Sequence, residues 1–301
     1  MDRVIKYFET MNYSTYRLNE PLKNHTYIKV GGAAKVLFTP KTKDELVSTI
    51  RFLIEEEIPY KVIGNGSNLL CSDKPYEGVV IKNTRALREI KVEGTSVIAQ
   101  SSVPMVKLAL DLCKLGLSGM EFIHGIPGTV GGGLFMNCGA YNREMKDVLE
   151  WVKILDEKGN IRTLSVDECG YRYRHSKFKY HPNWLILEGK FHLERKDPKE
   201  IKALMDRRKE RRVQAQPLDY PSCGSVFKNP EGTHAYLFVD QAGLRGYQIG
   251  GAQISQKHCN FIINLQEATA MDVRSLIELA QVKVYETSGV VLEREVEYFN
   301  F

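Results

Sequence analysis

Two glycine-rich segments hold the residues with the clearest chemical potential in this chain of 301 residues. The first reads VIGNGSNLL and places Gly64 and Gly66 directly after a short apolar run. Glycines at such a position let backbone N–H groups approach an anion, and Ser67 and Asn68 add side-chain donors. A hairpin turn explains this segment equally well, because Asn-Gly is a strong turn dipeptide.

The second segment, Gly119 to Tyr141, reads GMEFIHGIPGTVGGGLFMNCGAY, with glycines spread among apolar residues. A solvated linker lacks this character, so we expect either a backbone that packs on something large and flat or a glycine-rich turn inside the core. The first loop is not a Rossmann fingerprint, because Leu69 stands in place of the third glycine, and no Gly-Lys-Ser/Thr follows as in a Walker A loop. Two phosphate-capable loops indicate a dinucleotide held in a different way.

Three further segments carry polar groups that could act on a substrate. Ser225 follows Gly224 in PSCGSVFKNP, where a serine is ordinarily a turn or capping residue. Arg172 and Arg174, in YRYRHSKFK, would share one face of a strand and are by default surface ion-pair partners. The terminal LEREVEYF would place three carboxylates on one face of a strand, normally a solvated edge. These carboxylates belong to Glu293, Glu295 and Glu297.

The elements that must position these groups follow from hydrophobic periodicity, and they predict an α+β fold. The sequence predicts a strand, a tight turn and a second strand over 26–38, helices over 43–57, 105–115 and 271–285, and strands over 60–63, 78–81, 96–100 and 290–299. The charge-dense stretch over 193–216 marks the expected domain boundary. Its basic run, Arg207 to Arg212, favours a solvated helix face over an anion patch.

Composition places the chain among ordinary globular proteins, with 43% hydrophobic and 26% charged residues. The net charge of +5 is interspersed, which suits an anionic small molecule and does not predict a nucleic-acid partner. No leader-like or membrane-spanning apolar run occurs, so we expect a cytoplasmic protein without a membrane partner. The six cysteines show no framework spacing and are expected to be reduced, and no zinc-type spacing predicts a metal.

The pair VIGNGSNLL and GIPGTVGG resembles the FAD-binding domain of the vanillyl-alcohol oxidase (PCMH) type, and FMNCGAY extends the resemblance to the UDP-N-acetylenolpyruvoylglucosamine reductase (MurB) family. The resemblance spans 26–295 and is closest to the shorter, second type, because the chain runs from Phe191 straight into the charged stretch. It implies a helical segment over 1–20, an FAD-binding domain over 21–200 and a substrate-binding domain over 201–301.

The resemblance also implies roles for individual residues. Within GSVFKNP and YRxS, it makes Ser225 the proton donor and Arg174 the group that holds an enolate or carboxylate. Within EV it makes Glu295 a catalytic residue that would pair with Arg174 or hydrogen-bond the intermediate as it forms. Arg172, Glu293 and Glu297 keep their surface interpretation. The implied non-covalent FAD-binding residues are Gly64, Asn65, Gly66, Ser67, Asn68, Gly125, Gly128 and Gly132. The implied substrate contacts are Tyr141, Lys228, Asn229, Gln253 and His258.

The activity implied by the resemblance is the reduction of UDP-N-acetylglucosamine enolpyruvate by NADPH through bound FAD, without an obligate protein partner. Two alternatives stay open on the sequence. An oxidase of the same flavin fold often tethers its flavin through His or Cys, and Cys71 lies near the first loop. A nucleotide-sugar-binding module that kept the fold without the redox step would carry the same loops.

Overall fold

A computed structural model describes residues 1–301, and its contacts group the chain into two compact units. Unit 1 comprises Met1–Asn19, Lys35–Asn65 and Glu77–Glu210, and unit 2 comprises Glu20–Ala34, Gly66–Tyr76 and Arg211–Phe301. Unit 2 therefore combines the C-terminal third of the chain with two segments from its N-terminal quarter, which no change in composition marks. The domain boundaries at 20 and 200 stay a prediction, whereas the α+β class is confirmed.

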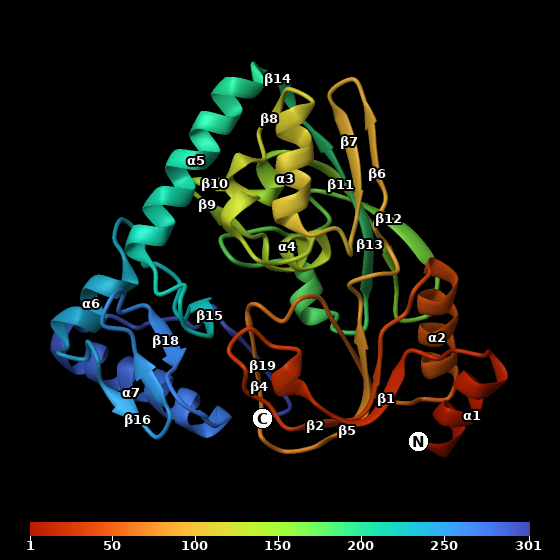
Figure 1. The fold of residues 1–301 in the computed structure, drawn as a ribbon, viewed down its shortest axis with the longest axis horizontal. Coiled ribbons are helices and arrows are strands. Elements are labelled where there is room, and N and C mark those ends of the chain that lie inside the picture. Colours follow the sequence, from red (N-terminus) through yellow and green to blue (C-terminus); the bar gives the residue numbers. More distant parts are fainter. The chain divides into compact units, whose positions relative to one another are not determined.

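The main sheet of unit 1 has five antiparallel strands in the order β12-β11-β13-β7-β6 (Figure 1). These strands are β6 (Ile90–Glu93), β7 (Ser96–Gln100), β11 (Leu149–Leu155), β12 (Ile161–Ser165) and β13 (Leu185–His192). Gly189 in β13 gives α4 (Val130–Met136) room to pack, because a Cβ there would lie 3.0 Å from the Leu134 side chain. The helix of the second glycine segment thus rests on this sheet.

A second core in unit 1 surrounds the N-terminal helices and the parallel pair β3–β5. Phe8 of α1 and Phe38 of β2 stack with ring centroids 4.6 Å apart and are fully buried. Thr42 caps α2 by accepting from the Glu45 amide, which satisfies one of the helix's unpaired N–H groups. The elements are α1 (Asp2–Thr10), β1 (Tyr16–Pro21), β2 (Ala33–Phe38), α2 (Lys43–Glu55), β3 (Tyr60–Ile63) and β5 (Tyr76–Lys82).

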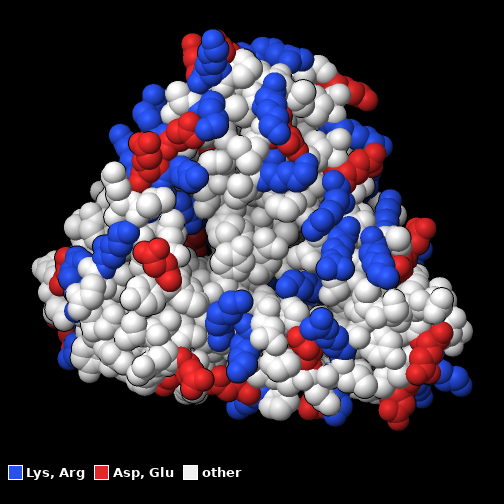
Figure 2. All heavy atoms as spheres, viewed as in Figure 1, with Lys and Arg blue, Asp and Glu red and all other residues white.

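The remaining elements of unit 1 surround α4 and continue into a long polar helix. They are α3 (Met105–Lys114), β8 (Leu117–Ser118), η2 (Glu121–Gly125), β9 (Gly139–Ala140), β10 (Arg143–Glu144), β14 (Glu194–Arg195) and the long helix α5 (Pro198–Ala215). The other turns of 3-10 helix here have four residues or fewer. Figure 2 shows Lys and Arg interspersed with Asp and Glu along α5. Arg207, Lys209 and Arg211 are exposed, in agreement with a solvated helix face.

Unit 2 packs a small antiparallel sheet, β15-β18-β17-β16, with two helices around one hydrophobic core. Its long helix α7 begins with a capping box between Thr269 and Asp272, and Asp73 accepts from the Ala270 amide at 2.9 Å. The elements are β4 (Leu69–Cys71), β15 (Ser222–Ser225), α6 (Ala235–Gln241), β16 (Gln248–Ile249), β17 (Ala252–Ile254), β18 (Phe261–Asn264), α7 (Ala270–Ser288) and β19 (Glu297–Phe299).

The helices and most strands predicted from periodicity are confirmed, and three predictions are wrong. Residues 26–30 form a turn, because the Thr26 hydroxyl bonds to both backbone groups of Val30. The terminal strand covers only Glu297–Phe299, so the three glutamates do not line one strand face. Arg172 and Arg174 lie in a tight turn rather than on a strand. No helix of the structure has the length and apolar character that a membrane crossing requires.

Candidate active site

The two glycine loops meet within unit 1. Asn65 donates from Nδ2 to the carbonyl of Pro127 at 3.1 Å, and a Cβ on Gly64 would lie 2.7 Å from the Thr129 hydroxyl oxygen. The hairpin interpretation of the first loop is wrong, since β3 pairs with β5 and β4 pairs with β19. The loop therefore ends one sheet and leads into another, with its backbone beside the second loop.

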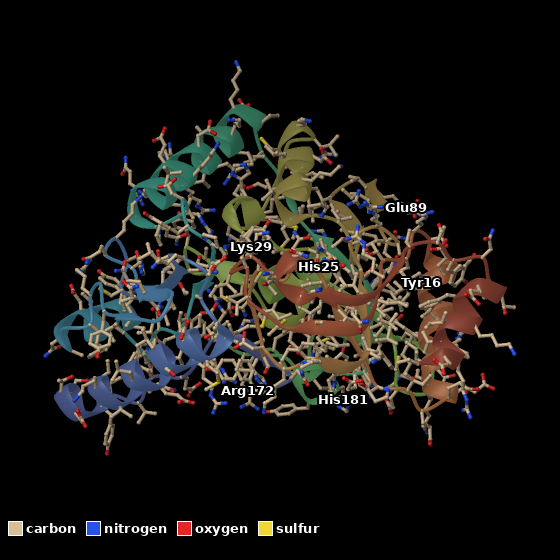
Figure 3. All side chains as sticks on the ribbon, turned by 60° about the horizontal axis from the view of Figure 1, so that its bottom comes forward. Tyr16, His25, Lys29, Glu89, Arg172 and His181 are labelled. Carbon is tan, nitrogen blue, oxygen red and sulfur yellow. The ribbon has the colours of Figure 1, made fainter.

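The rest of the first loop is braced within unit 2 by the turn that precedes β2. Gly66 accepts from the Tyr27 amide at 3.1 Å, and its φ of +66° together with the His25 carbonyl leaves no room for a Cβ. At the start of this turn, His25 Nε2 lies 2.9 Å from the Glu20 carboxylate. Figure 3 shows His25 and the exposed Lys29 on this turn. The position of Gly66 is thus fixed by backbone contacts.

Three consecutive glycines in α4 differ in what requires them. A Cβ on Gly131 would lie 2.8 Å from Ser101 Cβ, and one on Gly133 would lie 2.7 Å from Met105 Sδ. Gly132 is exposed, and the nearest atom to its Cβ position is the Thr129 hydroxyl at 3.7 Å. Packing within the protein does not require glycine at 132, so the bare backbone there fits a ligand that approaches closely.

The second loop before α4 has its own anchors. Gly128 is buried and its carbonyl accepts from the Met105 amide at 3.0 Å, while Gly125 is half-buried at the end of η2. Thr129 caps α4 by accepting from the Gly132 amide at 3.3 Å. The backbone of the second loop is therefore held on rigid supports, with Gly132 as its exposed glycine.

Ser225 ends β15 beside a bulge in the pairing with β18. Gly224 has a φ of +80°, a conformation that favours glycine. The residues after Ser225 are clamped by buried Asn260, whose side chain accepts from the Phe227 amide at 2.9 Å and donates to its carbonyl at 2.8 Å. Two hydrogen bonds from one side chain thereby fix the direction in which the chain leaves Ser225.

Glu295 lies on the segment next to this clamp, still within unit 2. Its amide donates to the Val226 carbonyl at 2.8 Å, and its carbonyl accepts from Asn68 Nδ2 at 3.1 Å. The backbone carbonyl of Asn68 accepts from the Glu297 amide, and this contact leads into the pairing of β4 with β19. The end of the first glycine loop, Glu295 and the segment after Ser225 are thus neighbours, and half-buried Ser67 lies in the same stretch.

Lys228 and Asn229 already have protein partners. Lys228 Nζ lies 2.8 Å from the Glu293 carboxylate, and this hydrogen bond lowers the pKa of Glu293. Asn229 accepts from the Ala235 amide at the start of α6. Glu293 is exposed, in agreement with its surface interpretation, and it forms a surface ion pair with the less exposed Lys228.

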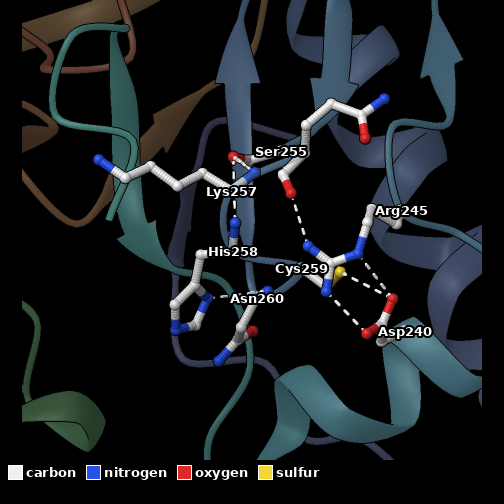
Figure 4. Close-up of polar contacts among 8 residues, drawn as sticks. Asp240, Arg245, Ser255, Lys257, His258, Cys259 and Asn260 are labelled. Atoms are coloured by element: carbon white, nitrogen blue, oxygen red, sulfur yellow. Dashed lines mark hydrogen bonds and ion pairs between the residues drawn. The ribbon is translucent and has the colours of Figure 1, made fainter. Parts of the chain in front are cut away.

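His258 lies in a small aromatic cluster beside Asn260. Its Nδ1 accepts from the Asn260 amide at 3.2 Å, so the neutral ring carries its proton on Nε2, and burial lowers its pKa. The rings of Tyr236 and Phe261 lie 5.2 and 5.0 Å away between centroids. Figure 4 shows this ring beside Asn260 and the separate contacts around Asp240. Gln253, the other predicted contact here, is half-buried in β17.

Arg174 belongs to unit 1 and occupies a strained position. Its φ is +50°, within a turn closed by a bridge between Arg172 and His175. Nη2 donates to the Gly139 carbonyl at 2.6 Å, and Nη1 lies 3.6 Å from a Glu144 carboxylate oxygen. The Arg172 side chain is exposed, whereas the Arg174 guanidinium lies against the end of the second glycine segment.

Tyr141 closes the second glycine segment. It is 44% exposed, its hydroxyl donates to the Arg208 carbonyl at 3.0 Å, and the Arg208 guanidinium lies 4.6 Å from the centre of its ring. Burial lowers the pKa of Arg208. The side chain therefore is both exposed and bonded through its hydroxyl.

Sequence reasoning missed the residues that support these groups. Asn260 and Glu144 hold Ser225's segment and Arg174 through contacts between residues distant in the chain, and nothing in their local sequence marks them. Asn137 was also missed, although an asparagine directly after a helical segment is a recognisable signal for its left-handed end, with a φ of +45°. Thr129, before the glycine run, shows the ordinary signal of a helix cap.

This α+β fold with two glycine loops on rigid supports defines an FAD-binding oxidoreductase. Residues 34–165 match the FAD binding domain family, and residues 216–299 match the C-terminal domain of UDP-N-acetylenolpyruvoylglucosamine reductase. The chain belongs to the UDP-N-acetylenolpyruvoylglucosamine reductase family.

Individual relatives cover nearly all of the chain. The reductase of Caldanaerobacter subterraneus subsp. tengcongensis is 46% identical over 294 residues, which are 98% of this chain and 97% of the relative. That of Exiguobacterium sibiricum is 45% identical over 280 residues, 93% and 91% of the two chains. The crystal structure of the Thermus caldophilus enzyme matches with a TM-score of 0.79 at 34% identity, covering 94% of this chain and 98% of that one.

Proposed function

We propose that this chain uses NADPH and bound FAD to reduce UDP-N-acetylglucosamine enolpyruvate to UDP-N-acetylmuramate, a step in peptidoglycan precursor synthesis. The reductase name borne by relatives that match 98% and 93% of this chain supports the substrate class. The observation that carries the assignment is the clamp in unit 2, which places Ser225's segment and Glu295 beside Asn68 of the first glycine loop. These substrates are cytoplasmic metabolites, so we assign the chain to the cytoplasm.

The glycine loops supply the binding surface for the cofactor. Gly64, Asn65 and Gly66 with Ser67 and Asn68 would hold one part of a bound diphosphate, and the second loop would hold the other, because the glycines let the ligand approach the backbone closely. The second loop contributes Gly125, Gly128 and Gly132. The chemistry that bound FAD would supply is hydride transfer from NADPH to the methylene carbon of the enolpyruvyl group.

Residues of the chain stabilise the negative charge that develops on the substrate and deliver the proton to it. Arg174 binds the substrate carboxylate through its planar guanidinium and stabilises the negative charge that develops as the methylene carbon is reduced. Ser225 delivers the proton from Oγ to the carbon next to the carboxylate, so its O–H bond breaks while a C–H bond forms, and solvent restores the hydroxyl. Glu295 orients the reacting groups as the third member of the site.

Binding of the nucleotide sugar falls to a second group of side chains. In this proposal Lys228 and Asn229 contact its anionic groups, and Tyr141, Gln253 and His258 contact its remaining polar atoms. Because Lys228 is paired with Glu293, an arriving phosphate would exchange one anionic partner for another. NADPH and the sugar nucleotide both carry a diphosphate, which suits alternating use of one cationic surface.

The test separates the two half-reactions in rapid-mixing experiments. Ser225→Ala should be reduced by NADPH at the rate of the unchanged protein, yet its reduced flavin should pass electrons to the enolpyruvyl substrate at least about 100-fold more slowly. Ser222→Ala is the matched control, because Ser222 begins the same strand. Normal turnover by Ser225→Ala would contradict the proton-donor assignment.

A further inference from the structure

The two carboxylate oxygens of Glu144 lie in different surroundings within unit 1. Its Oε2 accepts from Asn137 Nδ2 at 3.0 Å and lies 3.4 Å from Lys146 Nζ. Its Oε1 is buried and accepts no hydrogen bond, although Arg174 Nη1 lies 3.6 Å away. The Glu144 side chain also caps the 3-10 turn Met145–Asp147 by accepting from the Asp147 amide. This cap leaves the buried Oε1 facing Arg174 without a hydrogen bond, which is costly for a carboxylate oxygen.

Asn137 makes this carboxylate part of a rigid bracket. Asn137 is fully buried and has a left-handed backbone conformation at the end of α4. Its side-chain Nδ2 also donates to the Arg172 carbonyl at 3.0 Å. Its Oδ1 accepts from the Lys146 amide at 3.1 Å. One side chain therefore joins the end of α4, the segment that carries Glu144 and the turn that carries Arg174.

The turn on the other side is equally constrained. Arg174 is held in the left-handed region, which is unfavourable for a non-glycine residue, and its Nη2 is bound to the Gly139 carbonyl. Buried Ser176 bonds to the Phe135 carbonyl of α4. The Arg174 guanidinium is thus fixed at one edge by a carbonyl, and the Glu144 carboxylate faces another of its nitrogen atoms.

We propose that Glu144 is a positioning residue for Arg174. Its carboxylate orients the guanidinium plane and offsets its charge, so that the arginine is placed to receive an anionic group without reorganising. Asn137 links the Glu144 carboxylate and the turn of Arg174 to the end of α4, the helix that begins at the second glycine loop. The inference rests on the proposed function, in which Arg174 binds the substrate carboxylate.

The geometry gives a defined expectation for substitutions at Glu144. Glu144→Ala should slow reoxidation of the reduced flavin by the enolpyruvyl substrate about 10- to 100-fold, because a small displacement of a positioning group has effects of this size. Reduction by NADPH and FAD content should not change. Glu144→Gln keeps an acceptor for Asn137 but presents an amide to the guanidinium, so it should lose most of the same rate. Lys146→Met removes the exposed contact of Glu144 and should react normally.

A double-substitution cycle distinguishes positioning from simple structural support. In the Arg174→Ala background, Glu144→Ala should cause no further slowing, and calorimetry with the oxidised protein should show the same non-additivity in substrate affinity. Full rescue of the rate by Glu144→Gln, or equal slowing by Glu144→Ala in both backgrounds, would overturn the positioning role. A slow Arg174→Ala with a fast Glu144→Ala overturns this inference alone. Unchanged turnover in Arg174→Ala overturns the proposed role of the arginine, and that of Glu144 with it.

Discussion

The glycine triplet of α4 offers the sharpest test of where a cofactor approaches the chain. Gly132→Ala should leave the cofactor-free protein folded and more stable by about 0.4–1 kcal/mol, because alanine restricts the unfolded chain and its Cβ would make only an ordinary contact, 3.7 Å from the Thr129 hydroxyl oxygen. The same methyl group would occupy the surface that the flavin nucleotide needs. Overpacking of this kind costs about 1–3 kcal/mol, which corresponds to about 5- to 150-fold weaker FAD binding.

The neighbouring glycines provide matched controls with the opposite pattern. Gly131→Ala would bring its Cβ to 2.8 Å from Ser101 Cβ, and Gly133→Ala would bring its own to 2.7 Å from Met105 Sδ. Each should destabilise the cofactor-free protein by about 1–3 kcal/mol of overpacking, offset by less than about 1 kcal/mol of helix propensity. Met105 is a flexible side chain and can move, so the larger loss is expected for Gly131→Ala.

The assay for this series has two parts. Urea unfolding of the stripped protein gives the stability of each variant, and quenching of flavin fluorescence on titration gives its FAD affinity. Of the three variants, only Gly132→Ala should change stability and FAD affinity in opposite directions. If that variant bound FAD as tightly as the unchanged protein, the cofactor would not approach this part of the backbone.

Three further predictions concern unit 2. Asn260→Ala should lower the unfolding free energy by about 2–4 kcal/mol, measured by urea unfolding, because two buried backbone groups of Phe227 lose their partners; a loss below about 1 kcal/mol would contradict the clamp. His258 has a lowered pKa through burial, so its stabilising effect should be complete above the ordinary value near 6.5 and should decline as pH falls toward the lower folded value. His258→Gln should flatten that part of the stability profile, and an unchanged slope would rule out this group. Thr269→Ala should cost about 1 kcal/mol through loss of the cap on α7, and a neutral effect in thermal unfolding would show that Asp73 suffices.

Much of the fold could be predicted because periodicity reports burial directly. The helices at 43–55, 105–114 and 270–288 and the strands at 60–63 and 96–100 follow their apolar patterns closely. The pattern failed where side-chain hydrogen bonds compete with strand pairing. The alternating residues at 26–30 form a turn because the Thr26 hydroxyl hydrogen-bonds to the backbone N–H and C=O of Val30. Hydrophobic periodicity cannot predict such a hydrogen bond.

The glycine loops could be located from the sequence, but their supports could not. The contact of Asn65 with Pro127 joins residues 62 positions apart, and that of Asn68 with Glu295 joins residues 227 apart. Glu144 and Asn260 act through tertiary contacts of the same kind. Local residue types predict which backbone can approach an anion, whereas the groups that hold that backbone emerge only when distant segments pack.

The most direct test of the account is an anaerobic titration of the purified protein with its bound flavin. NADPH should bleach the flavin absorbance, and UDP-N-acetylglucosamine enolpyruvate added afterwards should restore it with one equivalent per flavin. A flavin that NADPH reduces but the enolpyruvyl substrate leaves bleached would contradict the proposed reaction, and a protein without flavin after reconstitution would contradict the role of the two loops.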